Sequence, residues 1–292
     1  MKNFLIKILV KLGHKIYHLF FYHYINLKFN GKTNYLNFKS PVRFNHKIIW
    51  LKKNYNSAKF SNFADKIKVK EFVEKKIGKN FCIPTIKIFN SAEDISLKDI
   101  SYPIIIKTNH GSNFNMIIKN PNSIDLNFIK KKYKEHLDVN YFDISREHQY
   151  KNIIPKVFIE PFLYNKFSDS LLDYKFFCFN GVPEVVQVDF NRFTKHTRNF
   201  YDLAWKKLDV QVLYPNNSNY FPKPKLLKKM IEISKTLSKD FPFIRVDLYQ
   251  FSNKVLFGEL TFHPEGGFSF IKPDSYDYLW GSKLDLKKLV NK

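Results

Sequence analysis

The chain has 292 residues, of which 44% are hydrophobic, and a formal net charge of +23. A chain of this length and composition can bury a sizeable core and divide into two or three lobes. The positive charge suggests nucleic acid, but only five of the 49 basic residues are arginine, the residue on which base reading relies. Because the lysines are also spread along the chain, we expect no nucleic-acid partner. A basic surface instead favours phosphorylated or acidic substrates and anionic membrane faces.

Residues 1–60 are predicted to form a basic helical extension. Apolar residues recur at helical spacing from Phe4 to Phe20, with lysines between them. The apolar run is broken too often for a transmembrane span, and it lacks the uninterrupted core and cleavage site of a signal peptide. Such a helix can lie on an anionic membrane surface, and packing on the protein's own core explains it equally well. The chain has two cysteines, which make no disulfide framework. The pattern therefore predicts a cytoplasmic protein, and contact with the inner membrane face remains an open alternative.

Residues 61–100 are predicted to form a linker region on the substrate side, and residues 101–165 are predicted to form a central lobe. Asp65 can cap a helix that runs to Ile77 and stops at Gly78. The apolar and polar pattern then predicts further elements in chain order: strands over 83–89, 102–107 and 116–119, a helix over 125–137 and a strand over 157–163. A loop from Thr108 to Asn115 joins the second and third of these strands.

The C-terminal lobe is predicted over 166–292. Strands over 174–180 and 184–190 are joined by a turn at Gly181-Val-Pro, and a helix over 222–239 leads to a hairpin that starts at Ile244. Helices and mainly antiparallel strand pairs interleave along the chain. The predicted fold class is therefore α+β.

The hairpin carries one carboxylate on each strand. Residues 244–249 alternate with the period of a half-buried strand, and residues 255–262 form a second extended run. If residues 252–254 form a three-residue loop, Asp247 faces Glu259 and Arg245 faces Thr261. Opposed carboxylates are destabilising unless a cation lies between them, and their hard oxygens suit Mg²⁺ that carries nucleotide phosphates. A two-residue loop would put Gly258 opposite Asp247 instead, and two solvated strand carboxylates remain the simpler alternative.

Several segments, in order, resemble the TupA-like ATP-grasp family, which is linked to cell-surface polysaccharide and teichuronopeptide biosynthesis. The resemblance covers roughly residues 38–285. It rests on seven segments, at residues 41–51, 64–73, 107–112 (Lys-Thr-Asn-His-Gly-Ser), 146–152, 173–181 (Asp-Tyr-Lys-Phe-Phe-Cys-Phe-Asn-Gly), 187–198 and 241–247. So many matched segments in order are specific, whereas any one alone would be weak. The resemblance implies an ATP-grasp fold, in which two α+β lobes grip ATP and Mg²⁺ between them.

The resemblance also implies residues that would bind the nucleotide. Lys107 would meet the α- or β-phosphate as a point charge, with Lys66 as a second cation. Both also read as ordinary lysines, one at a strand end and one on a basic helix. The loop that contains His110, Gly111 and Ser112 would cover the phosphates with backbone N–H groups.

Glu160 would contact adenine or ribose, although an exposed strand carboxylate is the alternative. Lys175 would reach a phosphate, with Asp173 to orient it. Arg245 would stabilise the charge on the transferring phosphoryl group.

The implied metal ligands are Asp247 and Glu259, with Thr261 at a position where the wider superfamily has asparagine. A hydroxyl is a poorer ligand than an amide oxygen, so a second metal ion is less expected. The family usually has further glycines after the loop serine, where this chain has Asn113 and Phe114. A stiffer loop of this kind puts tight ATP binding in question.

The best candidates for an acceptor pocket lie within ten residues of one another: Asp189, Arg192, His196 and Arg198. Two arginines and a histidine suit a carboxylate or a sugar acid. A basic surface loop explains them nearly as well.

The resemblance implies an ATP-dependent carboxylate–amine ligase. ATP would phosphorylate a carboxylate of an acidic sugar or glycan, and an amine would then displace the phosphate to give an amide. The implied context is a bacterial cell-surface polysaccharide or its precursor. A glycosyltransferase is the rival, but it would want an Asp-x-Asp motif, which the chain does not contain. A nucleotide-binding relic without catalysis is the third alternative, which Thr261 and the altered loop favour.

Overall fold

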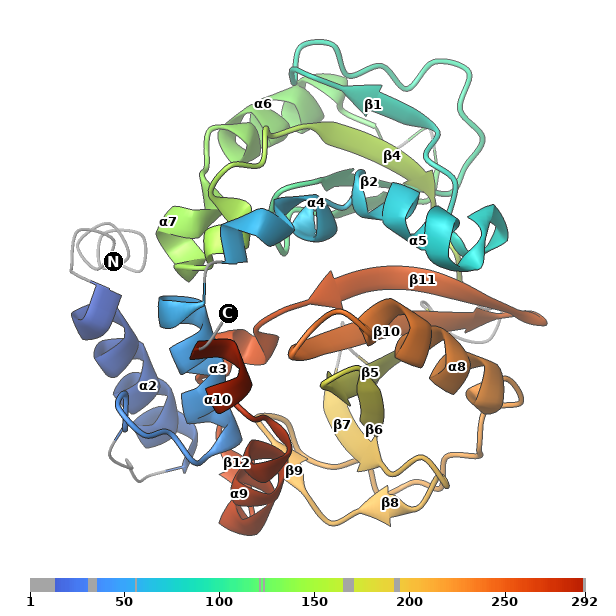
Figure 1. Cartoon of the computed structure of the whole chain (residues 1–292). Coiled ribbons are helices and arrows are strands. Elements are labelled where there is room, and N and C mark those ends of the chain that lie inside the picture. The colour runs from blue at the N-terminus through green and yellow to red at the C-terminus, as the bar shows by residue number, and fades with distance from the viewer. Residues whose placement is uncertain are drawn as a thin grey trace. The chain divides into compact units, whose positions relative to one another are not determined.

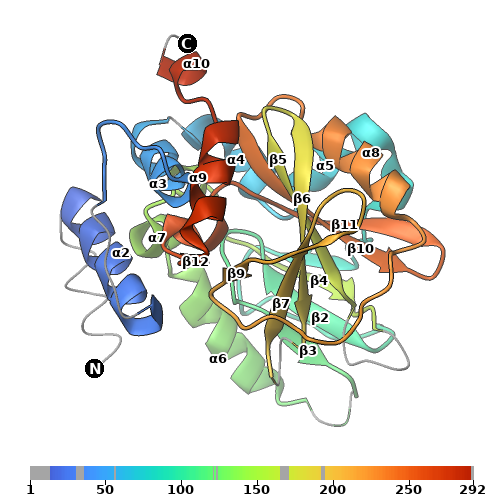
Figure 2. The same cartoon turned by 90° about the horizontal axis from the view of Figure 1, so that it is seen from below.

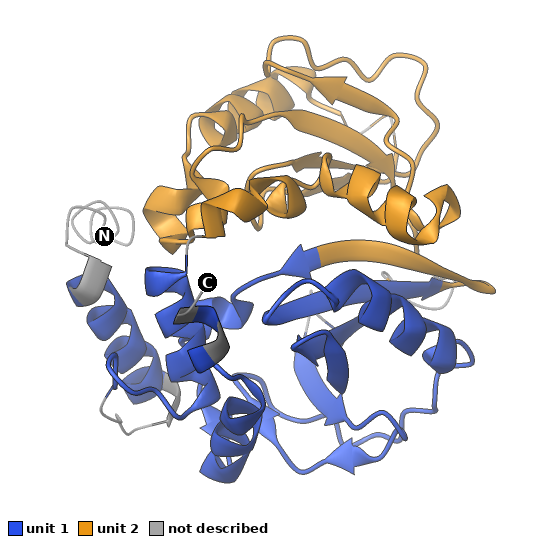
Figure 3. Cartoon of the chain, in the orientation of Figure 1, with its two compact units in different colours: residues 1–55, 172–250, 260–292 blue, residues 56–171, 251–259 orange. Residues whose placement is uncertain are grey.

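A computed structural model describes residues 14–30, 36–55, 57–120, 122, 124–164, 171–191 and 195–290. Over these residues the chain forms two compact units, which Figure 3 distinguishes by colour. Unit 1 comprises described residues of 1–55, 172–250 and 260–292, and unit 2 those of 56–171 and 251–259. Both combine helices with mainly antiparallel sheet, as predicted for the α+β class.

Unit 2 is built on a four-stranded antiparallel sheet in the order β1-β4-β2-β3 (Figure 1). Its strands are β1 (Lys87–Phe89), β2 (Ile104–Thr108), β3 (Met116–Ile118) and β4 (Val157–Pro161). Its helices are η1 (Ser57–Phe60), α4 (Ser61–Ala64), α5 (Val69–Ile77), η2 (Lys79–Phe81), α6 (Leu126–Leu137), α7 (Tyr141–Ser145) and η4 (His148–Tyr150).

The two faces of this sheet differ because side chains alternate along a strand. Ile104 and Ile106 of β2 point to one face, where they pack with Ile129 and Tyr133 of α6 in a buried cluster. Ile105 and Lys107 point to the other face. Ile105 pairs with Glu160 of β4, so Lys107 and Glu160 share the face that α6 does not cover.

Unit 1 contains most of a six-stranded sheet in the order β11-β10-β5-β6-β7-β8. Its strands are β5 (Asp173–Phe179), β6 (Val182–Phe190), β7 (Thr197–Tyr201), β8 (Lys207–Leu208), β10 (Phe243–Phe251) and β11 (Lys254–Thr261), the last of which begins in unit 2. A separate pair joins β9 (Gln211–Val212) to β12 (Ile271–Lys272). The helices are α2 (His14–Asn30), α3 (Phe44–Asn54), α8 (Leu227–Ser238), η5 (Pro264–Gly267), α9 (Asp274–Lys283) and α10 (Lys287–Val290).

One face of the unit 1 sheet is covered by α8, which packs on β5 and β6 (Figure 1). The opposite face divides along the strands. At one end, aromatic side chains of the sheet, among them Phe177, Phe200 and Phe243, pack with Phe44 of α3 and Trp280 of α9 in a buried cluster. At the other end the same face carries Lys175 on β5 and Asp247 on β10, which are register partners. The apolar cluster therefore ends where the charged residues begin.

Most predicted elements are present, but local turns and prolines shift their boundaries. The predicted helix at 65 begins only at Val69, because Asp65 Oδ1 accepts hydrogen bonds from the backbone N–H groups of Ile67 and Lys68 in a preceding turn. The predicted strand over 83–89 is reduced to β1, since Pro84 cannot donate to a ladder. The helix predicted from 222 begins at Leu227, whose N–H bonds to the carbonyl of Pro224.

Among the described elements that were not predicted, β7 is the longest strand and α9 the longest helix. β7 has mixed polar and aromatic residues, and it is recognisable as a strand only through its pairing with β6. α9 lacks a regular apolar stripe, yet it packs along α3 (Figure 2). Close contact between these helices depends on Gly281, where a Cβ atom would lie 2.1 Å from the carbonyl oxygen of Val42 and 2.8 Å from the nitrogen of Phe44.

Gly281→Ala tests this close approach. Alanine normally stabilises a helix interior relative to glycine by about 0.5–1 kcal/mol. Here we expect the free energy of unfolding to fall by about 3 kcal/mol instead, because the added methyl group must push α9 away from the backbone before α3. Urea unfolding followed by circular dichroism measures the change. The exposed neighbour Ser282→Ala is the control and should shift stability by less than about 0.5 kcal/mol; an equally stable Gly281→Ala variant would show that the two helices are not in close contact.

Candidate functional site

The carboxylate of Glu160 holds two lysines on the open face of the unit 2 sheet. Lys107 Nζ donates to Glu160 Oε2 at 2.7 Å, and Lys70 Nζ forms a short ion pair with Oε1. Lys70 also donates to the carbonyl of Ile83 at 2.7 Å and to Thr85 Oγ1 at 2.6 Å. Burial alone would raise the pKa of Glu160, but the two ammonium groups outweigh it and hold the pKa below its ordinary value. Glu160 is therefore a buried, ionised strand residue.

Lys66 and Glu259 of unit 2 lie close enough to this cluster for their charges to interact with it. Lys66 Nζ makes a short hydrogen bond to the carbonyl of Gly111. Burial lowers the pKa of Lys66, and the nearby charge of Lys107 lowers it further, while the carboxylates of Glu259 and Glu160 oppose both effects. The unit thus gathers three lysines, from the turn before α5, from α5 and from β2, around two glutamates.

The loop after Lys107 is anchored by its side chains. Asn109 Nδ2 donates to Asp65 Oδ2 at 2.9 Å, and Asn109 Oδ1 accepts from the N–H of Lys156 at 2.7 Å. The His110 ring is buried, with Nε2 at 3.2 Å and 3.1 Å from two carbonyl oxygens at the end of α6, and burial lowers its pKa. Because His110 is turned into unit 2, only its backbone is available for the phosphate-covering role. Ser112 is exposed.

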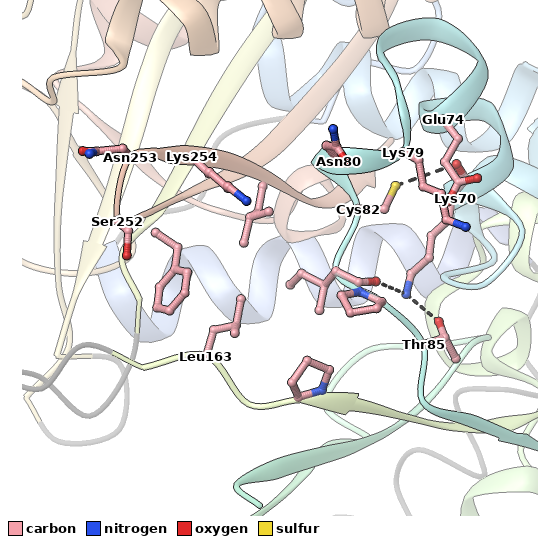
Figure 4. Close-up of a pocket in the computed structure, with 15 residues that line it drawn as sticks. Lys70, Glu74, Lys79, Asn80, Cys82, Thr85, Leu163, Ser252, Asn253 and Lys254 are labelled. Atoms are coloured by element: carbon pink, nitrogen blue, oxygen red, sulfur yellow. Dashed lines mark hydrogen bonds between the residues drawn. The ribbon is translucent and has the colours of Figure 1, made fainter. Parts of the chain in front are cut away.

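Unit 2 also contains a cavity of about 910 Å³, shown in Figure 4. Apolar side chains contribute much of its lining: Ile83, Pro84, Pro161, Leu163, Phe251 and Leu256. Lys70 also lines the cavity, and its ammonium group binds the carboxylate of Glu160. Cavities of 300–1,000 Å³ with apolar walls and a few polar groups are typical of small-molecule sites.

In unit 1 the carboxylate of Asp189 accepts from four donors. Its Oδ1 receives Arg198 Nε at 2.6 Å and lies 3.0 Å from His196 Nε2. Its Oδ2 lies 2.9 Å from Lys175 Nζ and receives Gln187 Nε2 at 3.0 Å. Burial would raise the pKa of Asp189, but these partners hold it well below the usual range. Three of the four predicted acceptor residues are thus brought together, and Arg192 lies outside the described residues.

β10, which pairs with β5, carries a second buried pair. Arg245 grips Asp247 with two parallel bonds of 2.7 Å, from Nε to Oδ1 and from Nη2 to Oδ2. Nη2 also donates to Thr261 Oγ1 at 3.0 Å. Lys175 Nζ lies 3.9 Å from Asp247 Oδ2 and 3.8 Å from Asp173 Oδ2, so it stands among three carboxylates.

The hairpin itself is present, and of the two loops considered for it the structure has the two-residue one. β10 ends at Phe251 and β11 begins at Lys254, so Ser252 and Asn253 form a two-residue turn, with Ser252 at φ 54°. The bond from Arg245 to Thr261 nevertheless puts these side chains on one face, as the three-residue loop required. A β-bulge, that is, one extra residue in β11 between the turn and Thr261, would account for both the two-residue turn and the bond from Arg245 to Thr261. The sharing of one metal ion by Asp247 and Glu259 stays a prediction.

Two residues of these clusters were not predicted. Lys70 follows Lys66 by one helical turn, and that spacing was the available signal. Glu265 accepts from Arg198 Nη1 at 3.0 Å, and the charges of Arg198, Arg245 and Lys175 lower its pKa. Glu265 has φ 50°, unusual for a residue with a side chain, and neighbours Gly266 and Gly267 in η5. A Cβ at Gly267 would lie 2.8 Å from Ile49 Cγ1, so η5 packs closely against α3 at this glycine.

A family model described as TupA-like ATPgrasp matches residues 46–285. The chain belongs to the TupA-like ATP-grasp family. This match covers most of the chain, and it confirms the family that the seven segments predicted. No curated protein sequence matches the chain.

Solved structures with some similarity include three ligases. D-alanine–D-alanine ligase from Helicobacter pylori is 15% identical with a TM-score of 0.43, and the match covers 76% of this chain and 58% of that chain. The Bacillus anthracis enzyme complexed with ATP is 11% identical with a TM-score of 0.47, covering 78% and 66%. The ATP-grasp ligase PsnB, complexed with a precursor variant, Mg and ADP, is 9% identical with a TM-score of 0.43, covering 82% and 65%. The chain therefore spans less than two thirds of the length of each.

Glu160→Gln tests the ionised carboxylate of unit 2. We expect the free energy of unfolding at neutral pH to fall by about 2–3 kcal/mol, because two partly buried ammonium groups lose their counter-charge. The pKa of Glu160 is below its ordinary value of 4.5, so its stabilisation is complete above that pH and is lost as the pH falls through the lower folded-state pKa. Urea unfolding from pH 7 down to acid should show a shallower loss of stability in the variant. The exposed Glu135→Gln variant is the control, and identical pH profiles for wild type and Glu160→Gln would contradict the assignment.

Proposed function

We propose that the chain is an ATP-dependent carboxylate–amine ligase. The observation that carries the proposal is the cluster of Lys66, Lys70 and Lys107 around Glu160 on the open sheet face of unit 2, in a chain of the TupA-like ATP-grasp family. A triphosphate needs several cations held in fixed positions, because phosphoryl transfer depends on positioning and charge neutralisation. Lys107 and Lys66 would bind phosphate oxygens, and Lys70 would hold Glu160 in place.

The nucleoside end of ATP would lie by β4. Glu160 is the strand residue that we expect to contact adenine or ribose. The apolar cavity of Figure 4 includes Pro161 and Leu163, which follow Glu160 in the chain. Its volume is sufficient for a ring system, and its walls offer the apolar surface that a base requires. The N–H groups of residues 110–112 would cover the phosphates.

The carboxylates present fit a magnesium ion. Mg²⁺ takes oxygen ligands, and proteins usually hold it by one or two carboxylates together with substrate phosphates. Asp247 and Glu259 would supply those carboxylates, and over the described residues no group of three or more Asp, Glu, His or Cys side chains could hold a metal by itself. The phosphates would therefore complete the ligand set. When bound, the ion would neutralise negative charge and make the γ-phosphate more electrophilic.

Arg245 is positioned by its partners before any substrate binds. The bidentate grip on Asp247 fixes the guanidinium plane, and Thr261 fixes one amino group. A pre-oriented guanidinium stabilises charge on a transferring phosphoryl group without reorganisation. We assign that role to Arg245, with Lys175 beside it at a further phosphate oxygen and Asp173 to orient Lys175.

The charge balance of unit 1 constrains the acceptor. The cluster contains three cations, Lys175, Arg198 and Arg245, and four carboxylates, Asp173, Asp189, Asp247 and Glu265. With His196 neutral, its net charge is −1. An anionic acceptor would gain little from the cluster as a whole, so we propose that it binds at the side formed by His196 and Arg198. Arg192 would add a further cation.

Membership of the family supports a proposal for the acceptor and its context. We propose that the carboxylate belongs to an acidic sugar or glycan of a bacterial cell-surface polysaccharide or its precursor. ATP would convert it to an acyl-phosphate, and an amine would attack the acyl carbon, releasing phosphate and leaving an amide. The reaction would take place on the cytoplasmic side of the membrane, where ATP is available.

A nucleotide-binding protein without catalysis is the second candidate. Thr261 favours it, because the hydroxyl that would be a third metal ligand already accepts a bond from Arg245. A glycosyltransferase is not favoured by any contact of the described residues.

Asp247→Asn and Glu259→Gln test the metal assignment. We expect each to lower ATP turnover by at least about 100-fold, because the loss of one carboxylate removes both charge and a ligand. The production of ADP, coupled to a pyruvate kinase and lactate dehydrogenase assay, measures turnover. Glu232→Gln, an exposed carboxylate on α8, is the control and should keep full turnover. Wild-type rates in either site variant would exclude the metal assignment.

Hydroxylamine trapping tests the acyl-phosphate. Hydroxylamine replaces the amine and converts an acyl-phosphate to a hydroxamate, which is detected as its coloured iron(III) complex. With ATP, Mg²⁺ and a panel of uronic acids, a ligase should form hydroxamate and ADP in equal amounts. ATP–Mg²⁺ that raises the melting temperature without any ADP production would identify the relic. Stabilisation by sugar nucleotides and not by ATP would identify the glycosyltransferase.

A further inference from the structure

The helix α2 has one face buried in unit 1. Tyr17, His18 and Tyr22 are at most 5% exposed. Tyr22 packs in a cluster with Leu36 and Ile49, and its hydroxyl lies 2.9 Å from His46 Nε2. Most of the helix predicted from Phe4 to Phe20 lies outside the described residues, so neither alternative for it is decided. Over α2, the buried side is formed by residues other than the predicted apolar ones, since Ile16 and Phe20 are exposed.

The opposite face of α2 exposes a continuous apolar stripe. It consists of Ile16, Phe20, Tyr24 and Leu27, with exposed fractions of 55%, 41%, 47% and 56%. Spacings of four, four and three residues place all four on one side of a helix. The rings of Phe20 and Tyr24 lie parallel, with centroids 6.1 Å apart. We call these four residues the α2 stripe.

The sequence of α2 carries basic residues and no acidic ones. The first 64 residues contain 12 lysines and arginines and no aspartate or glutamate. Lys28 is exposed at the end of α2, and its ammonium group lies 5.7 Å from the centroid of the Tyr24 ring. A partner of the α2 stripe must therefore accept apolar side chains and carry negative charge.

We propose that the α2 stripe docks on an anionic lipid surface. Aliphatic and aromatic side chains enter the boundary between headgroups and acyl chains, while flanking lysines remain among the anionic headgroups. A nucleic acid would satisfy the lysines but offers nothing to Ile16 and Leu27. No helix among the described residues is long and apolar enough to cross a membrane, so α2 would lie on the surface. This docking would keep the ligase next to a lipid-linked acceptor.

Vesicle sedimentation of the full chain tests the proposal. We expect binding to vesicles of phosphatidylglycerol mixed with phosphatidylcholine, weakening as salt is raised, and little binding to phosphatidylcholine alone. Phe20→Ser with Leu27→Ser should bind about tenfold more weakly, because two side chains lose their insertion into the apolar layer. Lys28→Glu should also weaken binding, and it leaves every apolar contact intact.

The control variants remove equally exposed apolar groups elsewhere. Tyr220 and Ile154 are 88% and 74% exposed, and their serine variants should bind vesicles as the wild type does. Thermal unfolding by circular dichroism confirms that the α2 variants are folded. Unchanged vesicle binding by the α2 variants would overturn the proposal. So would a wild-type chain that ignores vesicles and dimerises through the α2 stripe, which light scattering detects as a doubled mass that the serine variants lose.

Discussion

Neutralisation of buried charge within each sheet is the constraint on which both candidate clusters depend. A buried carboxylate without partners would protonate or destabilise the fold. Glu160 avoids this through ion pairs with two lysines. Asp189 avoids it through ion pairs with Arg198 and Lys175, beside which further donors bind the same carboxylate. The same partners fix the geometry of the cations. The residues that would handle phosphate are thus positioned by carboxylates that never need to touch it.

The alternation of side chains along strands explains why these clusters coexist with well-packed cores. In unit 2, the face of β2 with Ile104 and Ile106 is covered by α6, which leaves Lys107 on the other face. In unit 1, α8 covers one face and the aromatic cluster around Trp280 fills half of the other. The charged half is therefore flanked by a packed core, to which β5, β7 and β10 contribute Phe177, Phe200 and Phe243.

The sequence was sufficient to predict the fold class, the family, the hairpin and most helices and strands, because these depend on local periodicity and on ordered motifs. It was not sufficient where contacts between residues far apart in the chain determine the local structure. The two-residue turn at Ser252 could not be distinguished from a longer one, since neither residue is glycine. α9 has no clear stripe of its own, and Gly281 makes sense only against the backbone at Val42. Glu265 acquires its partner from β7, far away in the chain.

The loop after Lys107 shows how the chain replaces glycine with packing. The family pattern has further glycines where this chain has Asn113, which adopts φ 66°, and Phe114. The Phe114 ring stacks on His136 with centroids 4.4 Å apart, and Gly111 is held so closely that a Cβ atom would lie 2.9 Å from Phe114 and Tyr141. Asn109 and His110 anchor the start of the loop by hydrogen bonds. Glycine would leave such a loop many conformations, whereas aromatic packing restricts it to few and lowers the entropy lost when phosphates bind. The substitutions that suggested weaker nucleotide binding are thus compatible with a pre-ordered loop, provided that its backbone N–H groups point toward the triphosphate.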